Sequence, residues 1–379
     1  MNALVAFIFA ASGPVAIILA VGGRGGLTES DLASWIFGVF FVNGLISIAF
    51  CLAYRQPLVF FWTIPGAVLV GPALGHLGFA QVIGAYLATG LLMLALGLSG
   101  WVRRAMQAVP MPIVMAMVAG VFLRFGLDLV FALRDDFWIA APMVAAFLAL
   151  SASERLGRVL PPLIGALAVG ALLVAALGRF APPAEAIFAF AQPNFYAPAF
   201  SWQAMVELVV PLAITVLVVQ NGQGFAVLGA AGHAPPLNAI TVACGAGSLV
   251  TAFVGSVSTC LTGPVNAIIS ASGERHRHYA AGVLVGLFAL AFGLAAPFFT
   301  RLMLATPASF IAALAGLAML RVLQTAFTVS FGGRFTLGAL LTFIVTVADV
   351  AILNVGAPFW GLVFGFAASW LLERGDFRA

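Results

Sequence analysis

The sequence contains no lysine and very few charged residues of any kind. Only 7% of its 379 residues are charged, against roughly 25% in soluble domains, while 63% are hydrophobic and the mean hydropathy is +1.16. Such a chain cannot cover a folded surface with groups that water solvates, which excludes a soluble globular protein and leaves no basic patch for nucleic acid. The composition predicts a polytopic protein whose solvent is the lipid bilayer.

Cysteine and paired catalytic side chains are also scarce. Cys51, Cys244 and Cys260 lie inside apolar segments at unrelated spacings, which argues against a disulfide framework or a metal site. No pair of acids or histidines stands at helical spacing inside an apolar segment, so we expect neither an enzyme active site nor a cofactor.

What the sequence does contain is a series of apolar segments, each close to the roughly 20 residues that a membrane crossing needs. We expect fourteen spans, near residues 3–21, 34–53, 58–74, 79–99, 108–126, 137–151, 159–177, 204–225, 237–254, 256–272, 280–298, 303–323, 334–352 and 355–372. The first segment reads as a membrane helix because it lacks the pattern of a cleaved signal peptide.

The placement of arginine predicts the orientation of these spans. If both termini are cytoplasmic, eleven of the 16 arginines lie on the cytoplasmic side, Arg321 among them, and five lie outside, as the positive-inside bias requires. The proline-rich segment 179–203 is then a periplasmic linker between residues 1–178 and 204–379. Each half has seven spans, and an odd number forces the second half into the opposite orientation, so we predict inverted repeats.

Two spans do not read as continuous helices. In residues 58–74, β-favouring residues precede Pro65, and in residues 256–272 a hydroxyl-rich stretch precedes Pro264. Proline suits the first turn of a helix. Both segments therefore predict a short extended strand followed by a half-helix that begins in mid-membrane, where free N–H groups and the positive helix end favour an anion.

A cluster of amides interrupts the eighth span. Gln220, Asn221 and Gln223 stand with two glycines inside an apolar run, and amides in a bilayer must find partners. They can tie helices together, or they can donate hydrogen bonds to a ligand. Because the cluster lies beside the two predicted half-helix starts, we favour a ligand site for the cluster as a whole.

At these residues the chain resembles the BenE family of benzoate transporters, which share a seven-plus-seven architecture with the uracil permease UraA and the sulfate-permease type anion transporters. The landmarks are YRQPLVFFWTIPGA (54–67), QNGQGFAVLGAAGHAPPLN (220–238), ALAGLAML (313–320) and GAPFWGLVFG (356–365). The resemblance covers nearly the whole chain. It implies proton-coupled uptake of benzoate or a related aromatic carboxylate across a bacterial inner membrane by alternating access.

The resemblance also implies two domains with different roles and a substrate-binding site. Spans 1–4 and 8–11 form a core domain, and spans 5–7 and 12–14 form a gate domain. The family's substrate site carries over to Ser12, Thr63, Pro65, Gly66, Gln220, Asn221, Ser256, Ser258 and Thr259. Nucleobase relatives have a glutamate where this chain has Gln220, a departure that suits an anionic substrate. The tenth span is richer in hydroxyls and proline than the family pattern.

Proton coupling has a simple electrostatic reason. A carboxylate entering a cell that is negative inside is opposed by about 2.3 kcal/mol per 100 mV, and a co-transported proton cancels that charge. The candidate carriers are Asp349, expected deep in the thirteenth span, and Glu207, expected near the outer interface, while Asp128 is expected to pair with Arg124 one turn away. The substrate itself could also carry the proton.

Several alternatives stay open at this level. The same scaffold could serve an anion channel, an exchanger or a nucleobase-type transporter. A monomer and a homodimer are equally compatible with the sequence.

Overall fold

The computed structural model describes residues 2–153, 156–157, 160–181 and 189–377. Arg155, Arg158 and Arg378, which we count on the cytoplasmic side, and part of the linker lie outside these residues. The first half contains α1 (Asn2–Ala11), α2 (Gly13–Arg24), α3 (Glu29–Phe37), α4 (Asn43–Tyr54), β1 (Phe60–Trp62), α5 (Ile64–Ala73), α6 (Phe79–Ser99), α7 (Val102–Ala108), α8 (Met111–Asp135), α9 (Phe137–Ala152) and α11 (Pro162–Ala176).

The second half repeats this order. It contains α12 (Trp202–Ala204), α13 (Val210–Ile214), α14 (Gly222–Ala230), α15 (Leu237–Phe253), β2 (Thr259–Leu261), α16 (Gly263–Ser270), α17 (His278–Leu294), α18 (Ala296–Leu304), α19 (Ala308–Phe331), α20 (Thr336–Ala348) and α21 (Ala357–Leu372). In both halves a strand followed by a short helix stands third among the spans. The predicted all-helical membrane fold with two short strands is confirmed.

The lengths of the helices fit a membrane protein. Among the described residues, seven apolar helical runs, some of them made of consecutive helices such as α1 and α2, have at least 18 residues, and six more helices have 10 to 17. The eight-residue α16, the half-helix of the tenth span, is shorter than all of these. Short π-helical stretches, Gly38–Val42, Met205–Val209 and Thr215–Asn221, continue rather than end the second and eighth spans.

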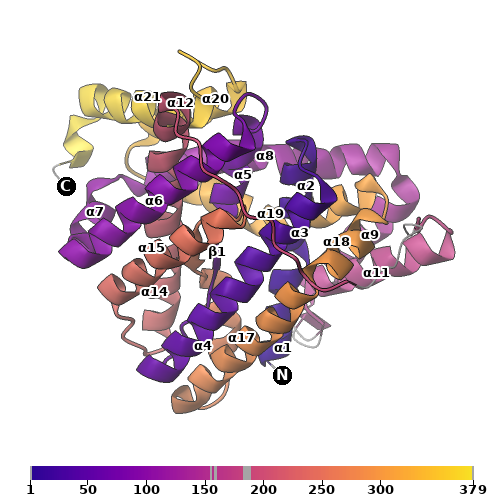
Figure 1. The fold of residues 1–379 in the computed structure, drawn as a ribbon. Helices are drawn as coiled ribbons and strands as arrows, with labels where there is room; N and C mark the ends of the chain where they lie inside the picture. Colours follow the sequence, from indigo (N-terminus) through magenta and orange to yellow (C-terminus); the bar gives the residue numbers. More distant parts are fainter. Residues whose placement is uncertain (1, 154–155, 158–159, 182–188, 378–379) are drawn as a thin grey trace.

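The helices form two groups that meet along a shared front. In one group α8 packs against α19 and α20, α20 against α21, and α9 against α11. In the other group α6 packs against α15 and α4 against α17, a pair that lies far from α20 and α21 in Figure 1. The groups meet closely where Gly13 faces α19, since a Cβ at Gly13 would lie 2.5 Å from the Cβ of Ala318.

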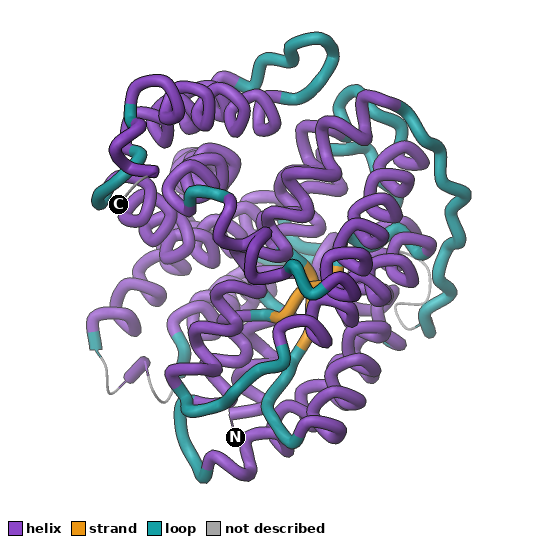
Figure 2. The backbone as a smooth tube through the Cα atoms, turned by 90° about the vertical axis from the view of Figure 1, so that its left-hand side faces the viewer, coloured by secondary structure: helices purple, strands orange, loops and turns teal. Residues whose placement is uncertain are grey.

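The two strands lie at the centre of the molecule, surrounded by helices (Figure 2). They pair antiparallel with Phe61 opposite Cys260, and every residue of both strands is buried. A two-stranded ladder leaves both outer edges unpaired, and unpaired backbone groups are not tolerated in hydrocarbon. The fold therefore has to supply partners from neighbouring helices.

Side chains from four helices supply these partners. The hydroxyl of Ser47 accepts from the N–H of Phe60 at 2.8 Å, and the hydroxyl of Ser248 accepts from Thr259 at 3.0 Å. The Oδ1 of Asn221 accepts from Leu261 at 2.8 Å, and the Oδ1 of Asn266 accepts from Val59 at 3.1 Å. Each strand thus has one serine and one asparagine at its edge.

Two span boundaries differ from our prediction in a way that matters for function. The first span is not one helix: α1 and α2 meet at Ser12, whose ψ of −96° is not helical. The twelfth span runs to Phe331 rather than ending near residue 323, so Arg321 lies well inside α19. Because the apolar segment was expected to end near residue 323, Arg321 was expected near a helix end on the cytoplasmic side.

We predict that Ser47→Ala lowers the free energy of unfolding by about 1–3 kcal/mol, because it leaves the N–H of Phe60 buried without a partner. Ser330→Ala is the matched control, since the buried Ser330 hydroxyl only bonds the carbonyl of Ala326 in its own helix. Thermal unfolding in detergent measures both. Equal effects of the two substitutions would contradict the role assigned to Ser47.

Candidate functional site

A cavity of about 950 Å³ lies between the two groups of helices, and we call it the central cavity. One wall comes from the first, third, eighth and tenth spans, through Phe9, Ile64, Pro65, Gln220, Gly222, Gln223 and Pro264. The facing wall comes from α8, α9, α11 and α19. Both half-helix starts therefore line the same space as the amide cluster.

The two half-helices begin at opposite ends of the short ladder, with their N-cap residues Thr63 and Thr262 about 13 Å apart by strand rise. The first is capped from within, because Thr63 Oγ1 accepts from the N–H of Gly66 at 3.1 Å. At the second, the side chain of Thr262 makes no such bond. Within the described chain, the N–H groups of Gly263 and Val265 have no acceptor. The start of α16 thus keeps free donors next to the cavity.

Gln220 and Gln223 lie on the cavity wall three residues apart, which places them on one face of their helix. Gln220 is 5% exposed, and its amide has no hydrogen-bond partner among the described residues. Gln223 lies over the start of α16, since a Cβ at Gly263 would come within 2.6 Å of Gln223 Oε1. Glycine at 263 is what allows the amide and the helix start to share this corner.

The rest of the amide cluster serves the fold. Asn221 is fully buried, and its amide bonds the edge of β2 and, at 3.5 Å, the sulfur of Cys244. A Cβ at Gly224 would lie 2.7 Å from Leu261, so this glycine lets the eighth span pack against β2. Asn221 and Gly224 thus tie helices and strand together, as one interpretation of the cluster holds, while Gln220 and Gln223 face the cavity, as the other holds.

Of the nine expected site residues, Pro65 and Gln220 line the central cavity, and the other seven lie behind its wall. The hydroxyl of Ser12 donates to the carbonyl of Phe9 at 3.1 Å, and that of Ser256 to the carbonyl of Trp35 at 2.8 Å. Thr259 Oγ1 donates to Asn43 at 2.8 Å.

Three of the seven belong to the strand and helix starts themselves. Thr63 caps Gly66 and donates to Thr215 Oγ1 at 3.0 Å, while the buried Ser258 hydroxyl has no partner in the described chain. Thr63 therefore positions the start of α5, and none of the three lines the cavity.

The cavity wall is mostly apolar. Phe9, Phe122 and Phe147 line it together with Met115 and Leu317. Within the described residues no aspartate or glutamate lines it, and one cation, Arg321, does. The site can therefore accommodate a flat apolar body together with a group that accepts hydrogen bonds.

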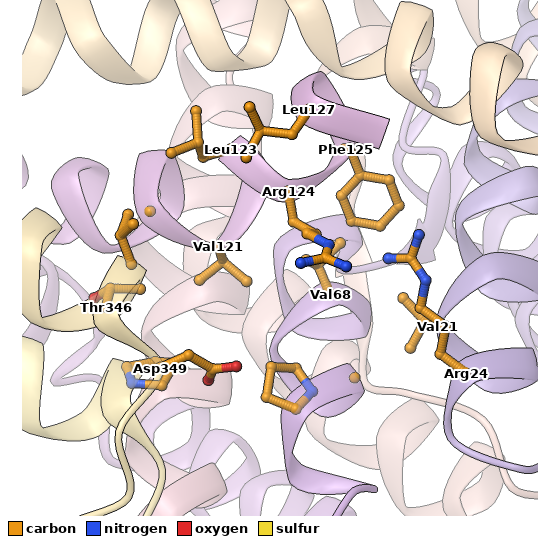
Figure 3. Close-up of a pocket in the computed structure, with 15 residues that line it drawn as sticks. Val21, Arg24, Val68, Val121, Leu123, Arg124, Phe125, Leu127, Thr346 and Asp349 are labelled. Carbon is orange, nitrogen blue, oxygen red and sulfur yellow. The ribbon is translucent and has the colours of Figure 1, made fainter. Parts of the chain in front are cut away.

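A second cavity, of about 400 Å³, lies near the other end of the front between the two groups, and we call it the charged cavity. Arg24 from α2, Arg124 from α8 and Asp349 all point into it (Figure 3). Arg24 pairs with Asp128 of α8 at 2.5 Å, and Arg124 pairs with Asp128 at 3.5 Å. The pairing of Arg124 with Asp128 is confirmed, and Arg24 adds a link between the two groups.

We had expected Asp349 to lie deep in the thirteenth span, and the structure places it elsewhere. The helix α20 ends at Ala348, and Asp349 caps it in the left-handed conformation with φ of 51°. In the loop that follows, partial burial raises the pKa of the Asp349 carboxyl above its usual value, which the positive charges of Arg124 and His76 oppose.

Glu207 also lies away from the central cavity. It is 4% exposed and pairs with His76 at 2.9 Å. Its carboxylate also contacts Gly356, where an added Cβ would lie 2.5 Å from Oε1. Neither of the two expected proton carriers lines the central cavity.

The structure adds Gly263 and Arg321 to the residues that the sequence had selected, and it places Gln223, a member of the predicted amide cluster, on the cavity wall. The spacing of Gln220 and Gln223 was a readable signal for this placement of Gln223. Gly263 precedes a recognised Pro264, so its place at a helix start was readable too. Arg321 had no such signal, because its importance depends on where α19 ends.

Comparison with known proteins gives consistent results. The family profile described as BenE, benzoate membrane transport protein, matches residues 1–371. The chain is 29% identical over 345 residues to the inner membrane protein YdcO of Escherichia coli, covering 90% of this chain and 87% of that protein. It is 26% identical over 378 residues to the benzoate membrane transport protein of Acinetobacter baylyi, covering 97% and 93%.

Solved structures share the fold at low identity. The transmembrane domain of a cyanobacterial bicarbonate transporter, BicA, has a TM-score of 0.60 at 15% identity and covers 97% of each chain. Murine Solute Carrier 26 family member A9, an anion transporter in the inward-facing state, has a TM-score of 0.65 at 15% identity, covering 98% of this chain and 68% of that one.

We predict that Asp128→Asn loosens the contact between α2 and α8 that closes one side of the charged cavity, because it removes the anion that pairs with Arg24. A cysteine introduced at Val121, which lines that cavity, should then react faster with a membrane-impermeant thiol reagent. Asp135→Asn is the control, since Asp135 pairs only with its exposed neighbour Arg134 in the described chain. An unchanged rate in Asp128→Asn would show that this ion pair does not hold the closure.

Proposed function

Because the chain belongs to the BenE family of benzoate membrane transport proteins, we propose that it takes up benzoate or a related aromatic carboxylate together with protons. The observation that carries the substrate class is the composition of the central cavity. Amide and backbone N–H donors meet at one corner of a mostly aromatic and aliphatic space, and the described wall contains no carboxylate.

The carboxylate would bind at the corner formed by Gln220, Gln223 and the start of α16. An anion at a helix N-terminus is stabilised by up to about 2 kcal/mol, and hydrogen bonds to a charged group by about 1.5–3 kcal/mol each. These values allow selective binding that is still weak enough for release. The apolar ring would lie against the phenylalanine and methionine side chains of the facing wall.

The two groups of helices support movement by alternating access. We assign spans 1–4 and 8–11 to the core domain and spans 5–7 and 12–14 to the gate domain. The central cavity reaches the exposed Met111 and Val329, where α8 begins and α19 ends. At the other side, Arg24 and Asp128 join core to gate. With cytoplasmic termini, this arrangement is a conformation open to the inside.

Proton coupling would compensate the charge of the substrate. Since the described wall of the central cavity lacks an acid, the proton would bind elsewhere or travel on the carboxylate itself. Asp349 is the stronger side-chain candidate, because it lies in the charged cavity between core and gate, where a change of protonation alters the balance around Arg24 and Arg124.

Gln220→Ala should weaken benzoate binding by a factor of roughly 10 to 150, which corresponds to losing a hydrogen bond of about 1.5–3 kcal/mol to a charged group. Calorimetric titration of purified protein measures the affinity, and an unchanged melting temperature shows that the fold is intact. Gln107→Ala is the control, because Gln107 is an exposed amide outside the central cavity. Wild-type affinity in Gln220→Ala would remove Gln220 from the site.

Asp349→Asn should reduce accumulation of benzoate against its gradient while leaving equilibrium binding unchanged, since the substitution removes a titrating group but keeps its shape. Proteoliposomes with an imposed pH gradient measure this, with pH and membrane current recorded together. Uptake by the wild type that carries net negative charge and no protons would instead indicate a channel or exchanger. Full accumulation by Asp349→Asn would exclude Asp349 and leave Glu207 or the substrate itself as the proton carrier.

A further inference from the structure

One charged side chain of the central cavity has no role in the proposed carboxylate site or in proton coupling. Arg321 lies on α19, on the gate wall, and is the single ionisable residue among the described residues that line the cavity. Its guanidinium bonds Gln324 Oε1 at 3.1 Å and has no acidic partner in the described chain. An unpaired cation in a cavity that holds no carboxylate calls for an explanation.

A helix-end anchor does not explain Arg321. Arginines that orient membrane helices lie near the ends of the helices and extend to the lipid head groups. Arg321 precedes the last residue of α19 by ten positions, about 15 Å at helical rise. It belongs to the stripe of α19 that lines the cavity, with Leu317 and Ala318 before it and Thr325 after it.

Arg321 lies between the break in the first span and the end of the central cavity that reaches exposed residues. Ala318 touches the break in the first span at Gly13, and Arg321 follows one turn later, toward Met111 and Val329 where the cavity reaches exposed residues. A ligand that enters from that end passes Arg321 before it reaches the donors of Gln220 and α16. Arg321 is itself exposed at this open end, and the apolar walls beyond it concentrate the field of a single charge toward the interior of the cavity.

We propose that Arg321 is a specificity-determining residue that draws anions into the central cavity from its open end. This proposal rests on the proposed function for its natural ligand, a carboxylate, but not for its electrostatic effect. The positive charge is the property that matters, so lysine at this position should preserve the effect and glutamine should abolish it.

The first experiment measures the potential in the cavity without any substrate. Thr325→Cys places a thiol one turn from Arg321 on the cavity wall, and the three native cysteines are fully buried. We compare its rates of modification by sulfonatoethyl methanethiosulfonate, an anion, and trimethylammonioethyl methanethiosulfonate, a cation. Arg321→Gln should lower the ratio of anion rate to cation rate about tenfold, the lower end of electrostatic steering effects.

The second experiment measures benzoate affinity at low and at high ionic strength. Arg321→Gln should weaken binding at low ionic strength about tenfold and flatten the salt dependence, because steering by an accessible charge is screened by salt. Arg321→Lys should behave as the wild type in both experiments. Arg103→Gln, which removes an exposed arginine outside the cavity, should change neither.

The outcomes separate this inference from the proposed function. An unchanged reagent ratio in Arg321→Gln overturns the role of Arg321, even if benzoate binds. A lowered ratio in a protein that binds no benzoate supports Arg321 as the anion-attracting residue and refutes benzoate as the ligand. Equal losses in Arg321→Gln and Arg321→Lys would indicate a packing role and contradict the proposal.

Discussion

The structure depends on one constraint: backbone N–H and C=O groups must find partners inside a bilayer. Two short strands at the centre of the protein break the regular helices and so create unpaired edges. Ser47, Ser248, Asn221 and Asn266 complete these edges from four surrounding helices. The broken segments can exist only because both halves of the chain contribute to the same small polar centre.

This constraint also determines where a ligand can bind. One half-helix start is capped by Thr63, whereas the start of α16 keeps its free N–H groups beside Gln220 and Gln223. The pair of inverted repeats is therefore symmetric in its architecture but not in its hydrogen bonding. An anion at the α16 corner satisfies donors that the protein leaves unpaired, while the aromatic wall opposite accommodates an apolar body. Folding and binding thus use different backbone groups of the same broken segments: side chains pair the strand edges, while the N–H groups at the start of α16 stay free.

The sequence was most informative where local chemistry decides the outcome. Pro65 and Pro264 predict two half-helices, and the flanking β-favouring and hydroxyl residues predict the strands, all of which the structure contains. Which amide serves the ligand and which serves the fold could not be predicted, because Gln220 and Asn221 are adjacent amides whose roles depend on which way each points from the π-helical stretch. The positions of Asp349 and Arg321 depend on helix ends that tertiary packing determines. Asp349 was therefore expected too deep in the thirteenth span, and Arg321 was expected too near the end of the twelfth.

The central claim is that a carboxylate binds at the corner where α16 begins. A structure of the protein determined with bound benzoate tests this claim most directly. The account predicts that the carboxylate lies within hydrogen-bond distance of Gln220 and of the N–H groups of Gly263 or Val265, with the ring toward Phe122 and Phe147. Benzoate bound elsewhere, or oriented with its ring at the start of α16, would contradict the account.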